Sequence, residues 1–139
     1  MARHSVKIAG KEHELRYTPK VRREIERARN GVPLISIMLN GDLDGQAAVL
    51  WGGLKHADRR LTVDRVVEML DEHLEGEHGD YQDVVYEAYL AVIDSRILGE
   101  VHRAGLTRAF RETLGIYPPS EDAGEEGPDP GGGKDPMKA

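Results

Sequence analysis

Residues 80–98 constrain the fold most, because they read as one long helix with apolar side chains on two separate faces. With about 100° between successive residues, one face is formed by Tyr81, Val84, Val85, Ala88 and Val92. The other is formed by Tyr86, Tyr89, Leu90, Ile93 and Ile97. Such a helix either lies in the centre of a helical core or exposes one face to a partner. The periodicity leaves both alternatives open.

Other segments also carry helical signals. Thr18-Pro19 is typical of a helix start and Asn30-Gly31 of a helix end. Pro33 precedes a short apolar segment of one or two helical turns at residues 34–39. We expect Asp44 and Thr62 to cap the following helices. The predicted helices span residues 19–30, 45–56, 62–74, 80–98 and 100–114.

Residues 5–17 alternate between apolar and polar, which predicts a β-hairpin. Ala9-Gly10-Lys11 supplies its turn. A lone hairpin is only marginally stable, so we expect it to pack on the helices through Val6, Ile8 and Leu15. His13, between two glutamates, is expected to face solvent. Trp51 is expected in the core, because leucines 50 and 54 share its helical face.

The chain from Pro118 onward differs from the rest in composition. Residues 118–139 hold five prolines, five glycines, six acidic residues and two lysines. Such a segment buries too little apolar surface to offset its ordering entropy. The sequence therefore predicts a mainly α-helical domain at residues 1–117, with an N-terminal β-hairpin, followed by a disordered acidic C-terminal tail.

The sequence lacks the residues that several classes of function require. The chain has no cysteine, which excludes disulfides, thiolate zinc sites and cysteine nucleophiles and fits a reducing cytosol. It has no apolar run near the ~18 residues of a membrane span and no apolar N-terminal signal. His73 and His78 lack the spacing of a metal site. Gly52-Gly53 lies in a helical pattern, where the missing side chains are expected to let a neighbouring backbone come close. We expect no enzyme activity, catalytic residue, cofactor or metal.

A basic run on the first predicted helix raises the alternative of a nucleic-acid-binding regulator. It consists of Lys20, Arg22, Arg23, Arg27 and Arg29. Glu24 and Glu26 interleave with it, and no recognition-helix pattern follows. Of the net charge of −6, residues 118–139 carry −4, so the rest of the chain carries only −2 and is nearly neutral. These features argue against nucleic-acid binding as its main task.

The order of the motifs resembles that in a known family. A hairpin at residues 8–15 leads into the capped helix at Thr18-Pro19. Leu50-Trp51-Gly52-Gly53-Leu54 then precedes Leu61-Thr62. This pattern resembles the tail assembly chaperones of long-tailed bacteriophages and gene transfer agents. The resemblance covers residues 5–98 and is carried by structural residues. Gly52 stands where relatives often have alanine.

The resemblance implies a non-enzymatic protein of the bacterial host cytoplasm that is absent from the mature virion. It would bind the helical tape measure protein, help recruit tail tube subunits and self-associate into a homo-oligomer. Many relatives have a second form made by ribosomal frameshifting, and Gly133-Lys134 can be encoded by a slippery heptamer. The alternative is a structural tail or connector component of the virion.

The predicted partner-binding residues lie on the second apolar face of the helix at residues 80–98. They are Tyr86, Tyr89, Ile93 and Ile97. Aromatic anchors on a helix face suit the apolar ridges of a long helical client. The competing interpretation is that both faces of this helix belong to the core.

Overall fold

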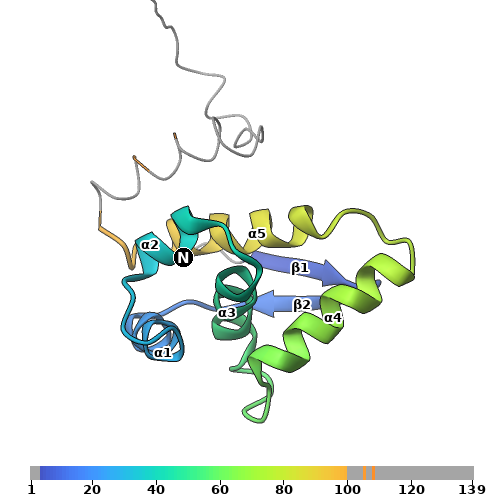
Figure 1. The fold of residues 1–139 in the computed structure, drawn as a ribbon, viewed down its shortest axis with the longest axis horizontal. Coiled ribbons are helices and arrows are strands. Elements are labelled where there is room, and N and C mark those ends of the chain that lie inside the picture. The colour runs from blue at the N-terminus through green and yellow to red at the C-terminus, as the bar shows by residue number, and fades with distance from the viewer. Residues whose placement is uncertain (1–3, 100–104, 106–107, 109–139) are drawn as a thin grey trace, which may run out of the picture. The chain divides into compact units, whose positions relative to one another are not determined.

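The computed structural model describes residues 4–99 together with Gly105 and Arg108. In this part of the chain, two strands are followed by five helices (Figure 1). Their bounds are β1 His4–Ile8, β2 Lys11–Leu15, α1 Pro19–Ala28, α2 Leu34–Asn40, α3 Leu43–Leu54, α4 Val63–Glu75 and α5 Tyr81–Asp94. The prediction of a mainly helical domain with an N-terminal hairpin is confirmed. The predicted tail lies outside the described residues.

The hairpin is closed by a two-residue turn. β1 and β2 are antiparallel, and Ile8 pairs with Lys11. Ala9 and Gly10 both have positive φ, 54° and 82°, as the tight turn that suits twisted strands requires. Lys11 is therefore a strand residue, and the prediction that it belongs to the turn was wrong.

The inner face of the hairpin packs on the helices as expected. Val6, Ile8 and Leu15 are all buried. The prediction for His13 was wrong. It pairs with Val6, so its side chain lies on the inner face and is half-buried. Alternate residues of a strand face the same side, and His13 shares its parity with Leu15.

α1 begins as predicted and also caps the next helix. Thr18 Oγ1 accepts a hydrogen bond from the Val21 N–H, and Pro19 is the first helical residue. The helix ends at Ala28, two residues before the predicted end. Pro33 gives α2 no side-chain cap, but Glu26 Oε2 of α1 accepts from the Leu34 N–H at 2.7 Å.

α3 is the central helix. It contacts all four other helices and β2 (Figure 1). Asp42 caps it, two residues before the predicted cap at Asp44. Nine of its twelve residues are buried. Trp51 is only half-buried, so its prediction as a core residue was wrong. Periodicity indicated one apolar face, whereas burial extends around most of the helix.

The glycine pair in α3 lets two side chains approach the helix. A Cβ on Gly52 would lie 2.5 Å from Ile25 Cδ1, and one on Gly53 would lie 2.5 Å from the Tyr17 hydroxyl. Tyr17 is buried and donates a 2.7 Å hydrogen bond to the Val49 carbonyl. A close approach at this glycine pair is confirmed, but the expectation of a neighbouring backbone was wrong, because the neighbours are the side chains of Tyr17 and Ile25.

α4 and α5 complete the described body. Thr62 Oγ1 caps α4, as predicted, by accepting from the Arg65 N–H. α5 ends at Asp94, four residues before the predicted end, and Arg96 has a φ of 64°. Ile97 therefore lies beyond the helix. Of the helix predicted at residues 100–114, Gly105 and Arg108 are described and helical, and the rest lies outside the described residues.

Candidate functional site

The four predicted partner-binding residues do not form one exposed surface. Tyr89 is 2% exposed and Ile93 is 5% exposed. Tyr86 and Ile97 are half-buried. α5 packs against β1, α3 and α4, so both of its apolar faces contribute to the core. The structure thus corrects the expectation for Tyr89 and Ile93, whose side chains are not accessible to a partner here.

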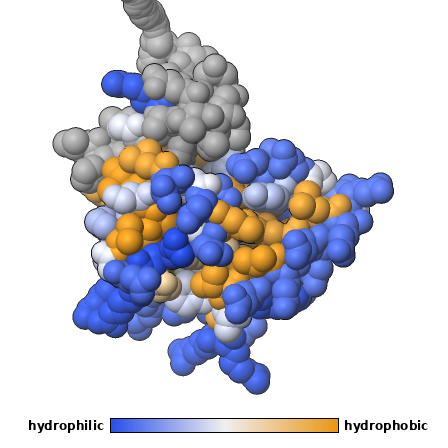
Figure 2. Space-filling model, in the orientation of Figure 1, coloured by the Kyte–Doolittle hydropathy of each residue, from blue (hydrophilic) through white to orange (hydrophobic). Residues whose placement is uncertain are grey.

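Among the described residues, three of the four exposed large apolar side chains lie instead around α2, and the fourth, Leu74, lies on α4. Val32 is 40% exposed, Leu39 53% and Leu43 43%. We call these three residues the α2 surface. Val32 and Leu39 line one hollow of about 490 Å³. Figure 2 shows hydrophobic atoms over α2 on this side of the molecule, bordered by hydrophilic ones.

The sequence of α2 contains a signal for this surface. α2 is only seven residues long, and all of them except Ser36 and Asn40 are apolar. These five apolar side chains lie on more than one side of the helix. Leu34, Ile37 and Met38 are buried. A short helix at the edge of a body cannot bury every side, which leaves Leu39 in solvent.

A salt bridge borders the hollow beside the α2 surface. Arg29 Nη2 at the end of α1 lies 3.2 Å from Asp42 Oδ2, and both residues line the hollow. Asp42 also accepts from the Gly45 N–H as the α3 cap. An apolar patch with a charged rim is the usual anatomy of a protein-binding surface.

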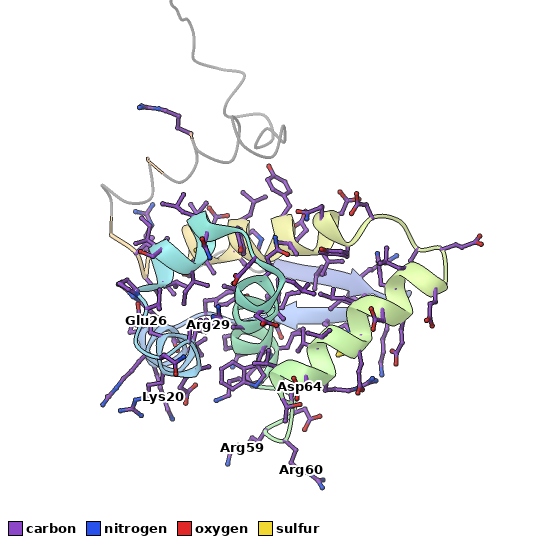
Figure 3. The ribbon with its side chains drawn as sticks, viewed as in Figure 1. Lys20, Glu26, Arg29, Arg59, Arg60 and Asp64 are labelled. Atoms are coloured by element: carbon purple, nitrogen blue, oxygen red, sulfur yellow. The ribbon has the colours of Figure 1, made fainter. Side chains whose placement is uncertain are left out.

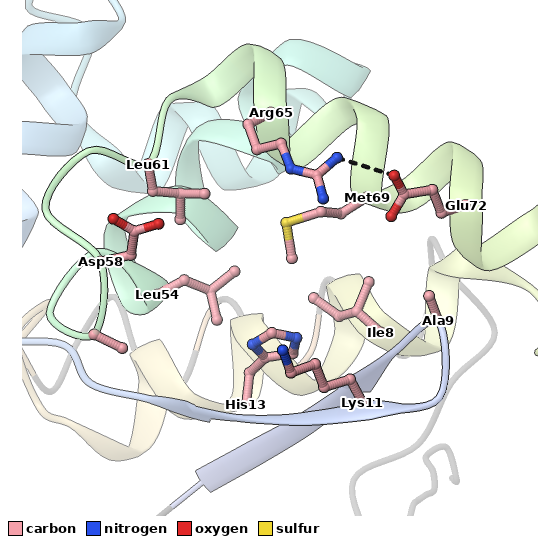
Figure 4. Close-up of a pocket in the computed structure, with 11 residues that line it drawn as sticks. Ile8, Ala9, Lys11, His13, Leu54, Asp58, Leu61, Arg65, Met69 and Glu72 are labelled. Carbon is pink, nitrogen blue, oxygen red and sulfur yellow. Dashed lines mark hydrogen bonds and ion pairs between the residues drawn. The ribbon is translucent and has the colours of Figure 1, made fainter.

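A second cavity lies between β2 and α4. Its volume is about 380 Å³, and we call it the β2–α4 groove. Figure 4 shows side chains converging on it from both sides and from the α3–α4 loop. Its apolar lining consists of Ile8, Ala9, Leu54, Ala57, Leu61 and Met69. Its polar lining consists of Lys11, His13, Asp58, Arg65 and Glu72.

Neighbouring groups set the pKa of His13 and the position of the Arg65 side chain in the groove. Burial, and then the positive charge of Lys11, lower the pKa of His13 below its ordinary value. Arg65 Nη1 donates to Glu72 at 2.9 Å and to Glu68 at 3.2 Å. The groove therefore favours a neutral imidazole at β2 and holds its arginine against α4.

His73 and His78 have structural roles at the hairpin. His73 Nδ1 accepts a 2.9 Å hydrogen bond from the Ala9 N–H, and its side chain is buried. The two imidazole rings lie 5.6 Å apart. Within residues 4–99, Gly105 and Arg108, no three histidine, cysteine or acidic side chains are close enough to hold a metal ion.

Two of the five residues in the basic run are engaged in the structure. Arg22 donates to Glu26 and, at 2.7 Å, to the carbonyl oxygen of Ile97. Arg29 pairs with Asp42. The remaining three, Lys20, Arg23 and Arg27, are exposed. Figure 3 shows Lys20 projecting from α1, while Arg59 and Arg60 project from the α3–α4 loop.

Comparison with known proteins gives no match. No protein family, no curated protein and no solved structure is detectably similar to this chain. None of the helices in the described residues has the length and apolarity needed to cross a bilayer. The resemblance drawn from the sequence therefore rests on the motif residues themselves.

Proposed function

We propose that this chain is a non-enzymatic tail assembly chaperone that binds the tape measure protein of a long-tailed phage or gene transfer agent. The exposed α2 surface is the observation that carries the proposal. A long helical client offers rows of apolar side chains, and Leu39 in its hollow offers a matching contact. In this proposal the α2 surface takes the role that the sequence assigned to Tyr89 and Ile93.

The motif residues behind the resemblance support the proposal in a second way. Gly52 accommodates Ile25, and Gly53 accommodates Tyr17. Trp51 Nε1 donates to the Leu61 carbonyl at 2.8 Å. Each motif residue thus joins two parts of the helical body. A pattern built from packing residues is what a shared scaffold requires, whereas a shared reaction would require reactive side chains.

Co-expression with the tape measure protein encoded near the same gene tests the proposal. We expect the two proteins to co-purify. Leu39→Asp should abolish co-purification, because a buried carboxylate would have no partner in the complex. Leu74→Asp is the matched control, since Leu74 on α4 is 48% exposed and lies outside the α2 surface. Both variants should retain the helical circular dichroism of the parent.

Two outcomes would contradict this assignment. Failure of the parent chain to bind the tape measure protein would remove the proposed client. Equal loss of binding in Leu39→Asp and Leu74→Asp would move the contact away from the α2 surface. Recovery of the chain at fixed stoichiometry from purified particles would replace the chaperone with the alternative, a structural tail or connector component.

The second proposed partner is the tail tube protein, reached through a longer product of the same gene. Expression with the native downstream DNA, followed by intact-mass spectrometry, tests this part. Two products that share an N-terminus and diverge near Gly133-Lys134 would support the frameshift. A single product ending at Ala139 would contradict it and leave tape measure binding to be judged by co-purification.

A further inference from the structure

The outer edge of β2 carries backbone groups that point away from the hairpin. Ile8 and Lys11 close the two-residue turn as a hydrogen-bonded pair. Hydrogen-bonded and non-hydrogen-bonded pairs alternate along an antiparallel ladder. His13 therefore bonds to β1, whereas the N–H and C=O groups of Glu12 and Glu14 point outward.

Arg16 is the next residue along this edge, after Glu12 and Glu14, whose backbone groups point outward. The Arg16 N–H donates a 3.0 Å hydrogen bond to the carbonyl oxygen of Gly53 in α3. This bond covers the edge at one end of β2. Among the residues that the structure describes, no backbone partner outside the hairpin is bonded to Glu12 or Glu14. An uncovered strand edge is a template for another strand.

The β2–α4 groove lies along this uncovered part of the edge. Lys11 and His13 of β2 form one wall and Met69 and Arg65 of α4 form the other (Figure 4). Ile8, Leu54 and Leu61 supply further apolar lining. An edge strand beside an apolar cavity offers a guest chain both backbone hydrogen bonds and a pocket for its alternate side chains.

The opposite face of β2 selects the charge of a guest strand. The side chains of Glu12 and Glu14 lie on the solvent face of the hairpin and are exposed. Glu12 accepts a hydrogen bond from the Ser5 hydroxyl. Opposite charges on facing positions of neighbouring strands stabilise their pairing. Lysine or arginine on the solvent face of a guest strand would therefore complement these two carboxylates.

We infer that the β2–α4 groove binds an extended segment of a partner protein, which adds to β2 as an antiparallel third strand. Alternate apolar side chains of the segment enter the groove, and the intervening lysine or arginine side chains face Glu12 and Glu14. The strand edge and the groove are separate from the α2 surface. Binding at the groove therefore does not depend on whether the partner at the α2 surface is a tape measure protein.

The first test uses a blocked six-residue peptide in which valine and lysine alternate. Trp51 is the only tryptophan of the chain, and it is bonded to Leu61, which lines the groove. Its fluorescence should change as the peptide is added. The backbone amides of Glu12 and Glu14 should become protected from hydrogen exchange, since the third strand pairs with them.

Backbone methylation of the peptide separates strand addition from attraction of charge. In an antiparallel third strand, the lysine amides point at β2 and the valine amides point away. N-methylation of the lysine amides should weaken binding at least about tenfold, because it removes donors and adds bulk at the edge. N-methylation of the valine amides should be tolerated. Equal binding by the two methylated peptides would overturn the inference.

Charge reversal on the protein gives an independent test. Glu14→Lys should weaken binding of the valine–lysine peptide about two- to fivefold, as expected for one cross-strand charge pair. Asp71→Lys is the matched control, because Asp71 is exposed on α4 and does not line the groove. Equal weakening by both variants would indicate general electrostatic attraction and would contradict docking along β2.

Discussion

The indole Nε1 of Trp51 donates a 2.8 Å hydrogen bond to the carbonyl oxygen of Leu61, across the loop that joins α3 to α4. The ammonium of Lys55 lies 4.9 Å from the centre of the same ring. Lys55 also pairs with Glu24 of α1 at 2.8 Å. Trp51 and Lys55 at the end of α3 thus contact each other, the loop before α4 and, through Glu24, α1.

Trp51→Phe should lower the free energy of unfolding by about 1 kcal/mol, because the ring is kept while the hydrogen bond to Leu61 is lost. Urea denaturation followed by far-UV circular dichroism measures the change. Lys55→Met in the same assay removes both the cation on the ring and the ion pair with Glu24, and Glu24→Gln measures the loss of the ion pair alone. An unchanged denaturation midpoint in Trp51→Phe would show that the indole bond adds no stability.

Gly53→Ala should destabilise the protein by about 1–3 kcal/mol, because the new methyl group would lie 2.5 Å from the Tyr17 hydroxyl. A double-mutant cycle with Tyr17→Leu identifies the cause. In the Tyr17→Leu background the alanine should cost clearly less, since the aromatic ring is absent. Purely additive effects would locate the cost of Gly53→Ala elsewhere.

His73→Leu should lower stability by about 1–2 kcal/mol, because the N–H of the half-buried Ala9 loses its acceptor. His73→Asn is the matched control, since its amide oxygen can take the place of Nδ1. Thermal or urea denaturation should rank the parent above the asparagine variant and that variant above the leucine variant. A leucine variant as stable as the asparagine variant would contradict a role for this hydrogen bond.

Acidification should weaken the fold through His13. Its pKa in the folded state lies below the ordinary value of 6.5, so the unfolded chain binds more protons between these two values. The contribution of His13 to stability is thus complete above pH 6.5 and falls as the pH drops toward the folded pKa. His13→Gln should flatten the loss of stability over this interval. Parallel pH profiles for parent and variant would contradict the assignment.

Ile93→Asp should unfold the protein, because it would place a carboxylate at a side chain that is only 5% exposed. Ile97→Asp should be tolerated better, since Ile97 is half-buried and lies beyond α5. Circular dichroism and size-exclusion chromatography distinguish the two variants. A folded Ile93→Asp variant that fails to bind a client would restore Ile93 as a partner-binding residue.

The sequence predicted the start of a helix correctly where a single capping side chain determines it. Thr18 and Thr62 each cap through a bond to a backbone N–H three residues ahead. Asp42 and Asp44 are both competent caps near one helix start, and the apolar periodicity after them predicted Asp44 as the cap. Gly41 adopts a φ of 76° and brings Asp42 into the capping position. Which of the two aspartates caps α3 therefore depends on the turn that follows α2, since both are of the same residue type.

Tertiary contacts decided the features that periodicity missed. Periodicity identifies apolar faces, but it cannot tell how many sides of a helix are covered. α3 is covered on most sides, and Trp51 is one of its less buried residues. No glycine or proline marks the end of α5, where Arg96 takes a positive φ. Leu39 reaches solvent because α2 lies at the edge of the body, and the apolar sequence of α2 does not show which of its sides faces outward.

The hydrogen bond from Arg22 to the Ile97 carbonyl has a mechanical consequence. Arg22 also donates to Glu26, whose carboxylate accepts from the Leu34 N–H. A pulling force applied to the chain after Leu98 would therefore be shared with α1 and the start of α2 before it could peel α5 from the body.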